Sequence, residues 1–341
     1  MKAVILVGGK GTRLAPLTDV CPKPLLPVAN VPFVERTLER LRQAGCDEVV
    51  LSGHYLADDF RHLEEHTGVT VRLEIEDEPL GTGGAIGYAA RDFDSTFLVL
   101  NGDILSDTDL VAALKQHRSF GAEATIMLTP VDDPSRFGVV VTDDDGRVDA
   151  FIEKPEPGTA PSNMINAGLY VCEPEMLARI PSGRAVSIER ETFPAMVDDG
   201  ALFGLGSDAY WLDFGTIATY LQANLDVLDA RVCEPVPEAV APDARVARTA
   251  RIEEPVVIAD GSQIGESCEI GPRVAIGPGC SVGDGARIRD SVLLDGCSVG
   301  PGAEIAGAIV GAGAAVAEGS RLEEGDVVAP ADDPAGEPKG R

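Results

Sequence analysis

The chain has 341 residues, 44% of them hydrophobic, which is enough for two domains with ordinary cores. Its formal net charge of −28, from 28 basic and 56 acidic side chains, leaves no basic surface for nucleic acid or for an anionic membrane. No stretch is apolar over the roughly 18 residues that a transmembrane helix needs. The N-terminus lacks the basic start and the cleavage site of a signal peptide. The seven cysteines form no CxxC pair, so we expect a cytoplasmic protein with reduced cysteines.

Residues 1–230 alternate predicted strands and helices. Strands are expected at 3–7, 48–52, 70–75 and 97–101, and helices at 31–44 and 84–91. This alternation predicts an α/β domain with a mostly parallel sheet and helices on both of its faces. Further strands at 124–129, 138–142, 148–152 and 167–172 follow each other with few helices between them. The sheet is therefore expected to become mixed.

From residue 246 to about 330 the chain repeats with a period of six. The repeated aliphatic positions are Val246, Ile252, Ile258, Ile264, Ile270, Ile276, Val282 and Ile288, and after a slip of about one residue Val299, Ile305, Val310, Val316 and Leu322. This hexapeptide repeat resembles the left-handed parallel β-helix, in which three hexads make one coil and the aliphatic side chain points inward. Residues 231–245 are rich in proline and acidic side chains and are expected to be a linker, and residues 331–341 a disordered tail.

The first predicted strand runs directly into a glycine-rich segment, GGKGTR, at residues 8–13. Glycines let the backbone approach closely, so several N–H groups and the Arg13 guanidinium can surround an anion. The segment does not fit the phosphate loop GxxxxGK[ST]. It does not fit the dinucleotide pattern GxGxxG either, because Leu14 stands where that pattern needs glycine. Taken alone, it predicts either an anion-binding loop or a tight connection.

The glycine-rich segment is the first of several motifs that occur in a fixed order. They are GGKGTRL (8–14), PLT (16–18), PKP (22–24), EPLGTGGAI (78–86), NGD (101–103), FGVV (137–140), EKP (153–155), NAGLY (166–170) and WLDFGT (211–216). This set resembles the sugar-phosphate nucleotidylyltransferases, some of which also carry a C-terminal hexapeptide β-helix. The resemblance implies a Rossmann-like nucleotidyltransferase domain with a mixed sheet over residues 1–230, followed by a left-handed β-helix over 246–330. It also implies attack of a sugar-1-phosphate oxygen on the α-phosphorus of an NTP, with pyrophosphate leaving.

The resemblance carries over specific roles to residues of this chain. The catalytic residues would be Arg13, Lys23, Asp103 and Asp213, with Mg²⁺ held between the two aspartates, since Mg²⁺ prefers carboxylate and phosphate oxygens. Nucleotide binding would fall to Leu6, Gly8, Gly9, Gly11, Thr12, Arg13, Glu78 and Gly83. Sugar-phosphate binding would fall to Gly138, Glu153, Lys154 and Asn166. Lys154 would pair with the sugar phosphate, while Glu153 and Asn166 would bond hydroxyl groups.

The choice of base depends on the EPLGTGG segment, from which Glu78 is expected to face the base edge. A carboxylate only accepts hydrogen bonds, which suits the paired N1–H and N2–H₂ donors of guanine and favours GTP. The amino-acid sequences of these motifs resemble those of the mannose-1-phosphate guanylyltransferases most. Open alternatives are a glucose-1-phosphate thymidylyl- or uridylyltransferase, a heptose-phosphate guanylyltransferase, and a non-catalytic regulatory paralogue that binds a nucleotide-sugar. The flat faces of the β-helix predict a homo-oligomer.

Overall fold

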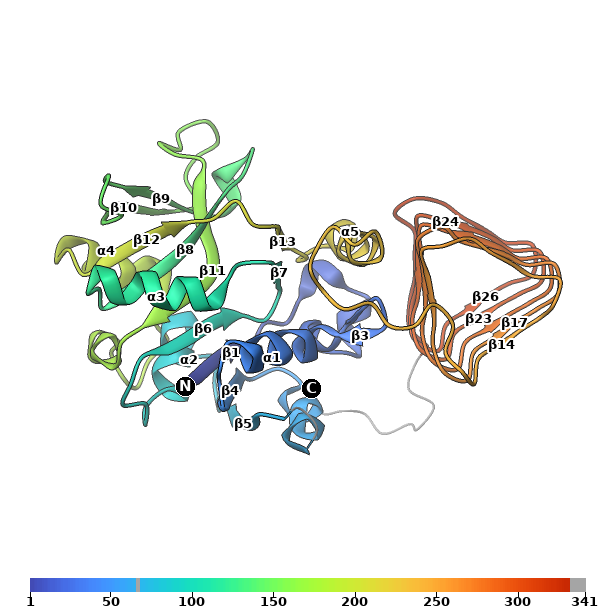
Figure 1. The fold of residues 1–341 in the computed structure, drawn as a ribbon, viewed down its shortest axis with the longest axis horizontal. Helices are drawn as coiled ribbons and strands as arrows, with labels where there is room; N and C mark the ends of the chain where they lie inside the picture. Colours follow the sequence, from blue (N-terminus) through green and yellow to red (C-terminus); the bar gives the residue numbers. More distant parts are fainter. Residues whose placement is uncertain (66–67, 332–341) are drawn as a thin grey trace. The chain divides into compact units, whose positions relative to one another are not determined.

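The computed structural model describes residues 1–65 and 68–331, so the predicted tail lies outside the described residues apart from Ala331. The chain forms two compact units (Figure 1). The first unit comprises Met1–Lys10, Pro22–Pro24 and Val34–Leu212. The second comprises Gly11–Cys21, Leu25–Phe33 and the chain from Asp213 onward. Two early segments, including the second half of the glycine-rich segment (residues 11–13), therefore group with the C-terminal part of the chain.

A nine-stranded mixed sheet forms the centre of the first unit. Its strands are β1 (Lys2–Leu6), β4 (Glu48–Gly53), β5 (Thr70–Ile75), β6 (Phe97–Asn101), β8 (Ala124–Pro130), β9 (Gly138–Thr142), β10 (Val148–Glu153), β11 (Met164–Cys172) and β12 (Leu202–Gly206). The main order is β10-β9-β11-β6-β1-β4-β5, and β8 pairs with β11 and β12. β1 is parallel to both β4 and β6, whereas β11 is antiparallel to β6. The expected α/β fold with a mixed sheet is confirmed.

Helices cover both faces of this sheet. The α-helices of the first 200 residues are α1 (Phe33–Gln43), α2 (Gly81–Ala89), α3 (Leu110–Phe120) and α4 (Phe193–Asp198). Other helical segments, of 3-10 or π geometry, lie at Thr12–Leu14, Leu17–Asp19, Lys23–Leu25, Ala57–Glu65, Pro134–Arg136, Pro174–Arg179 and Ile188–Thr192. Successive side chains of a strand point to opposite faces, yet Ala3, Val4 and Ile5 are all 0% exposed. Burial of both faces is what a sheet with parallel central strands requires.

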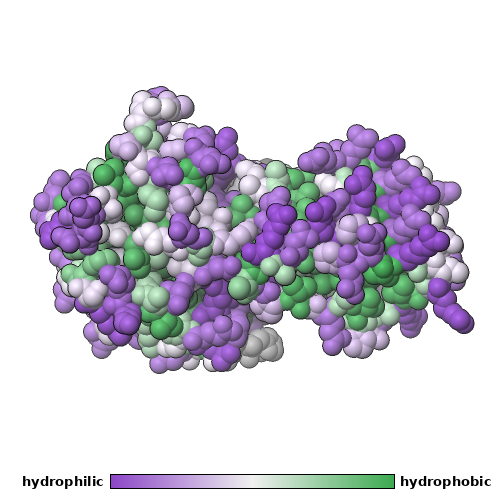
Figure 2. All heavy atoms as spheres, turned by 45° about the horizontal axis from the view of Figure 1, so that its top comes forward, coloured by the Kyte–Doolittle hydropathy of each residue, from purple (hydrophilic) through white to green (hydrophobic). Residues whose placement is uncertain are grey.

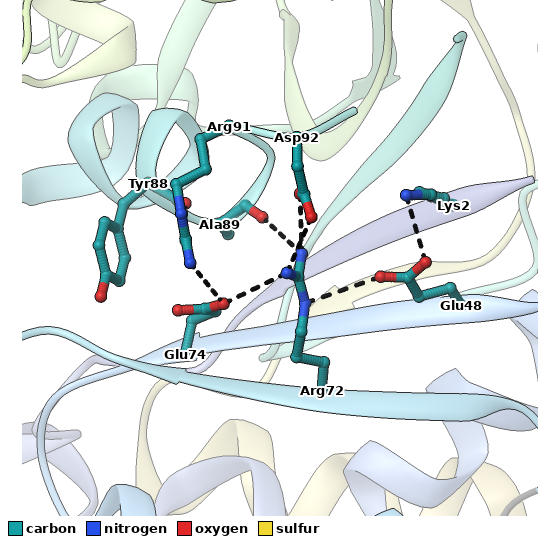
Figure 3. Close-up of polar contacts among 8 residues, drawn as sticks. All are labelled: Lys2, Glu48, Arg72, Glu74, Tyr88, Ala89, Arg91 and Asp92. Carbon is teal, nitrogen blue, oxygen red and sulfur yellow. Dashed lines mark hydrogen bonds and ion pairs between the residues drawn. The ribbon is translucent and has the colours of Figure 1, made fainter. Parts of the chain in front are cut away.

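Charged side chains on the edge strand β5 hold α2 in place (Figure 3). The Arg72 guanidinium donates to the Ala89 carbonyl at 3.3 Å and to the Asp92 carboxylate at 3.0 Å. Glu74, two residues further along the strand, pairs with Arg91 at 2.9 Å. A cation near the last carbonyls of a helix is favourable because of the helix dipole. These contacts stabilise a helix whose sequence, GTGGAIGYA, has low intrinsic helix propensity.

The repeat region of the second unit forms a parallel β-helix. Its strands are β14 (Arg245–Val246), β15 (Arg251–Ile252), β16 (Val256–Ile258), β17 (Gln263–Ile264), β18 (Glu269–Ile270), β19 (Val274–Ile276), β20 (Ser281–Val282), β21 (Arg287–Arg289), β22 (Ser291–Leu293), β23 (Ser298–Val299), β24 (Glu304–Ala306), β25 (Ile309–Val310), β26 (Ala315–Val316), β27 (Arg321–Leu322) and β28 (Val327–Val328). They build three five-stranded parallel sheets. Val246 pairs with Ile264 and Ile264 with Val282, 18 residues apart, whereas Val282 pairs with Val299, 17 residues apart. The expected hexads and the expected slip are both confirmed.

One of the three β-helix faces is covered by the last helix, α5 (Ile217–Leu228). Val256 and Ile258 belong to the β-helix core, so Val257 between them points outward, yet it is only 1% exposed. Ala275 and Val292 hold the same position in the next coils and are also buried beneath α5. This packing explains why α5 belongs to the same compact unit as the β-helix.

α5 also fixes the hairpin formed by β2 (Pro27–Val28) and β3 (Val31–Pro32). The fully buried Asn224 accepts from the Ala29 amide at 2.8 Å and donates to the Tyr220 carbonyl at 2.9 Å. The Tyr220 hydroxyl donates to the Pro27 carbonyl at 2.6 Å. On the β-helix side, the Asn30 amide donates to the Ile276 carbonyl at 2.8 Å.

β7 (Ile104–Ser106) and β13 (Trp211–Asp213) form a separate two-stranded sheet. Within residues 1–65 and 68–331, no helix combines the length and the apolar character needed to cross a membrane.

Asn224→Ala tests the clamp on the hairpin. The substitution leaves the buried Ala29 amide without its acceptor, so the free energy of unfolding should fall by about 1–3 kcal/mol. Urea denaturation followed by circular dichroism measures this change. Gln222→Ala, on the exposed side of the same helix, is the matched control and should change the free energy of unfolding by less than about 1 kcal/mol. Equal losses in both variants would contradict a specific role for Asn224.

Candidate functional site

A cavity of about 340 Å³ opens in the first unit where β1, β4 and β6 end and α2 begins. Of the residues predicted from the sequence, Leu6, Gly8, Gly9, Lys23 and Asp103 line it. Parallel strands commonly place ligand sites beyond their carboxyl ends, and this cavity lies at that edge of the sheet. The structure therefore brings together part of the predicted nucleotide site and two predicted catalytic residues.

Lys23 and Asp103 form an ion pair on the cavity wall. The Lys23 ammonium lies 2.6 Å from one Asp103 carboxylate oxygen, and the exposed fractions of the two side chains are 9% and 33%. Such a charge-assisted hydrogen bond fixes the direction of both groups. The arrangement places a cation suited to phosphate next to a carboxylate suited to a metal ion.

Gly102 explains why these two groups can meet. Its amide donates to the Leu6 carbonyl at 3.0 Å, which draws the NGD segment against the end of β1. A β-carbon at this position would lie 2.7 Å from the Leu6 carbonyl oxygen and 3.2 Å from Pro24. Only glycine fits this close approach without displacing backbone, so Gly102 is required to bring Asp103 to Lys23.

Glu76 is a site residue that the sequence analysis missed. It lines the cavity and is only 6% exposed, whereas Glu78 is exposed, and the described cavity wall does not include it. One Glu76 carboxylate oxygen accepts from the Ser52 hydroxyl at 3.2 Å, and the other accepts from the Leu80 amide at 2.8 Å. His54, also on the wall, donates through Nδ1 to the Glu76 carbonyl at 2.7 Å, since a carbonyl oxygen only accepts. Glu76 therefore supplies a second oriented carboxylate in this cavity besides that of Asp103, and a contact of Glu78 with the base stays a prediction.

Gly83, which the sequence analysis expects to bind nucleotide, packs against the segment at Val186, and its contact with nucleotide stays a prediction. Its amide donates to the Val186 carbonyl at 2.9 Å, and a β-carbon would lie 3.1 Å from the Val186 side chain. The described cavity wall includes Gly81 and Thr82 instead. The Thr82 hydroxyl donates to Glu189 at 2.7 Å, which ties this wall to the segment after Val186. Gly83 therefore serves the packing of α2 against that segment.

The four residues predicted to bind the sugar phosphate lie on β9, β10 and β11. Gly138 is paired with Glu153 in the β9–β10 register, and the Lys154 ammonium lies 3.2 Å from the Glu153 carboxylate. Asn166 lies on β11, which pairs with β9, and its amide donates to the Tyr170 hydroxyl at 3.0 Å. Burial raises the pKa of Tyr170, so its hydroxyl stays neutral and orients Asn166. Gly138, Glu153 and Lys154 are thus brought together, with Asn166 on a neighbouring strand.

Arg13 and Asp213 lie together in the second unit. The turn Thr12–Leu14 begins after Gly11, which has a φ of +61° that favours glycine. A β-carbon at Gly215 would lie 2.7 Å from the Arg13 guanidinium and 2.9 Å from an Asp213 carboxylate oxygen. The absence of a side chain at Gly215 therefore leaves room for these two groups side by side.

The expected magnesium site of Asp103 and Asp213 stays a prediction, because the two carboxylates belong to different compact units. In the described part of the chain, no group of three or more histidine, cysteine, aspartate or glutamate side chains is arranged to hold a metal ion. Two carboxylates are nevertheless a donor set that fits Mg²⁺, which commonly binds one or two carboxylates together with substrate phosphates and water.

Gly102→Ala tests the close approach of the NGD segment. The new methyl group must displace the Leu6 backbone, so we expect a loss of about 1–3 kcal/mol in unfolding free energy. Gly9→Ala is the matched control on the same cavity wall, since a β-carbon there meets no atom within 4 Å. Thermal unfolding followed by circular dichroism should show a lower midpoint for Gly102→Ala only. An unchanged midpoint in Gly102→Ala would contradict this explanation of the motif.

Comparison of the sequence with known protein families identifies the family of this chain. The family described as nucleotidyl transferase matches residues 2–230, and the chain belongs to it. A second family, described as the GMPPB C-terminal domain, matches residues 239–332, which includes the β-helix.

Several curated proteins are similar to this chain in sequence. The mannose-1-phosphate guanylyltransferase of Mycobacterium tuberculosis is 45% identical over 233 residues, which is 66% of this chain and 64% of the relative. The mannose-1-phosphate guanylyltransferase catalytic subunit beta of Danio rerio is 42% identical over 229 residues, 65% of this chain and 63% of the relative. The matched region thus spans a little less than two thirds of the length of these relatives.

Solved structures show the same fold. HddC from Yersinia pseudotuberculosis is 31% identical with a TM-score of 0.56, covering 65% of this chain and 97% of that protein. HddC has also been crystallised in complex with GMP-PN. A putative glucose-1-phosphate thymidylyltransferase from Bacillus anthracis, in complex with a sucrose, is 28% identical with a TM-score of 0.59, covering 66% of this chain and 94% of that protein.

Proposed function

We propose that this chain is a mannose-1-phosphate guanylyltransferase, which transfers a guanylyl group from GTP to mannose-1-phosphate and releases pyrophosphate. The main observation behind the proposal is the buried Glu76 carboxylate, which accepts two hydrogen bonds. It lies in the cavity that also contains the Lys23–Asp103 pair. A carboxylate accepts both the N1–H and N2–H₂ donors of guanine, whereas thymine and uracil present one donor between acceptors. The similarity to mannose-1-phosphate guanylyltransferases supports the same substrate pair.

In the proposed reaction an oxygen of the sugar phosphate attacks the α-phosphorus of GTP, and the bond to pyrophosphate breaks. The protein's task is to bring two anions together in line and to balance their charge. Lys23 and Arg13 bind phosphate oxygens, Arg13 through its bidentate fork. Leu6, Gly8, Gly9, Gly11 and Thr12 supply backbone near the phosphates. Asp103 and Asp213 would hold Mg²⁺, which neutralises charge on the phosphates when it is bound.

The sugar phosphate would bind at the ends of β9, β10 and β11. Lys154 offers its ammonium to the phosphate, and the adjacent Glu153 carboxylate keeps it in place at 3.2 Å. Glu153 and Asn166 can then accept from or donate to sugar hydroxyl groups. A β-carbon at Gly138 would lie 2.6 Å from the Phe151 ring and 3.2 Å from the Glu153 carboxylate, so glycine at this position lets both side chains pack against β9.

A heptose-phosphate guanylyltransferase is the second candidate, which the sequence motifs leave open; HddC, to which the chain is similar over nearly the whole of that protein, has been crystallised in complex with GMP-PN. A grid of NTPs against sugar-1-phosphates with Mg²⁺, read out as pyrophosphate, separates these candidates. GTP with mannose-1-phosphate should turn over fastest. Faster turnover of dTTP or UTP with glucose-1-phosphate would contradict the proposal, and absence of turnover in the whole grid would favour a regulatory nucleotide-sugar-binding protein.

The base contact is tested by comparing Glu76→Gln with Glu78→Gln. An amide at position 76 offers one acceptor and one donor, so the preference of kcat/KM for GTP over UTP should fall by about 10-fold or more, equivalent to about 1.4 kcal/mol. Glu78→Gln, on the exposed side chain two residues away, should keep the wild-type preference. A changed preference in Glu78→Gln alone would return the assignment to Glu78.

The carboxylate of Asp103 is tested by Asp103→Asn, which keeps the shape of the side chain and removes its charge. Loss of a preorganised charged group at the phosphates should lower kcat by about 10²–10³. Asp144→Asn, in an exposed turn, is the control for a general charge effect. Pyrophosphate release within a factor of about two of wild type in Asp103→Asn would exclude the proposed role.

A further inference from the structure

His54 is a residue of the cavity wall that lies outside every motif of the sequence family. It follows the last residue of β4, Gly53, and lines the same cavity as the Glu76 carboxylate. The Nδ1 atom of its ring donates to the Glu76 carbonyl at 2.7 Å, which places the ring proton on Nδ1. In a neutral imidazole ring Nε2 is then a hydrogen-bond acceptor. In the part of the chain that the structure describes, no protein group bonds to this Nε2, and the side chain is only half-buried.

The position of His54 is between the proposed base site and the glycine-rich segment. Its ring bonds to the backbone of Glu76, whose carboxylate is proposed to bind guanine. Its own backbone lies beside the glycine-rich segment, since a β-carbon at Gly8 would lie 3.4 Å from the His54 amide nitrogen. The ribose of a nucleotide connects its base to its phosphates. A nucleotide with its base at Glu76 and its phosphates at Gly8 therefore brings its ribose to His54.

The chemistry of a nucleotide also matches an acceptor to the ribose. GTP has hydrogen-bond donors at N1–H and N2–H₂ of guanine and at the two ribose hydroxyl groups, whereas its phosphate oxygens and the guanine O6 and N7 atoms accept. The proposed function assigns the guanine donors to the Glu76 carboxylate. The ribose hydroxyl groups are thus the donors that remain for Nε2 of His54.

A neutral imidazole suits this place better than a carboxylate. Carboxylates are common partners of a ribose hydroxyl group, but next to a triphosphate they add repulsion between like charges. The chain already has a formal net charge of −28, and Figure 2 shows hydrophilic residues over much of the face that it displays. The cavity wall itself carries the carboxylates of Glu76 and Asp103. His54 offers an acceptor without a further negative charge.

We propose that Nε2 of His54 accepts a hydrogen bond from a ribose hydroxyl group of the bound nucleoside triphosphate, and that this contact selects ribonucleotides. The inference rests on the proposed function for the place of the nucleotide in the cavity, but it does not depend on which base is bound. A site that is built to bond a hydroxyl group rejects an analogue that lacks it, because a polar group of the site is then left without a partner.

The test measures binding to the full chain by isothermal titration calorimetry without sugar phosphate, so that no turnover is needed. Wild type should bind GTP about 10-fold more tightly than 2′,3′-dideoxy-GTP, which lacks both hydroxyl groups. His54→Asn keeps an N–H donor near the position of Nδ1, and so the bond to the Glu76 carbonyl, but removes Nε2. In this variant the preference for GTP over the dideoxy analogue should fall to within about twofold, while the preference for GTP over UTP should stay as in wild type.

His62→Asn is the matched control. The ring of His62 also bonds through Nδ1 to a backbone carbonyl, that of Asp59 at 2.8 Å, but its side chain is exposed and it is not among the residues of the described cavity wall. This variant should keep both wild-type preferences.

UTP and 2′,3′-dideoxy-UTP separate this inference from the proposed function. If wild type binds UTP as tightly as GTP, the proposed choice of base is contradicted, whereas the uridine pair still measures the ribose contact. The inference is overturned if wild type does not distinguish ribonucleotides from their dideoxy analogues, if His54→Asn keeps the wild-type preference, or if His62→Asn loses it. An equal loss of affinity for all four nucleotides in His54→Asn would indicate a phosphate contact and would also overturn it.

Discussion

The hydrogen bond from the Gly102 amide to the Leu6 carbonyl is the constraint on which the candidate site depends. It joins the end of β6 to the end of β1 and turns the chain so that Asp103 reaches Lys23 at 2.6 Å. Any side chain at Gly102 would push against the Leu6 backbone and separate the two strands. A cavity with a fixed cation and a fixed carboxylate is the direct result of this close approach.

The second unit is compact because α5 packs against the β-helix. The β-helix leaves one face of outward apolar side chains, among them Val257 and Val292, and α5 covers it. α5 in turn clamps the hairpin of β2 and β3 through Asn224 and Tyr220. Arg13 and Asp213 belong to this same unit. Two of the residues proposed to act in phosphate transfer are therefore carried by the body that contains the β-helix.

Much of the fold could be predicted from the sequence because its patterns are local. The period of six specifies the coils, and even the slip between Val282 and Val299 is visible before the structure. The alternation of strands and helices predicts the sheet. The predicted helix at 84–91 begins three residues too late, because the glycines in its first turn are weak helix formers. The structure begins this helix at Gly81.

The site was harder to predict because its details depend on contacts between distant segments. Glu76 was missed since, in an acidic chain, a glutamate after a strand is expected to be solvated. The pattern Arg72, Glu74, Glu76 was an available signal, as it places charges on one face of β5. The packing of Gly83 against Val186 could not be predicted, because the two residues lie about a hundred positions apart in the sequence.

A crystal structure of the chain with GTP tests most directly whether Glu76 recognises guanine in the cavity beside Lys23 and Asp103, as we propose. We expect the guanine N1 and N2 atoms to lie within hydrogen-bond distance, about 2.7–3.2 Å, of the Glu76 carboxylate, with phosphate oxygens at Lys23. A base bound outside this cavity, or turned so that Glu76 faces neither donor, would contradict it.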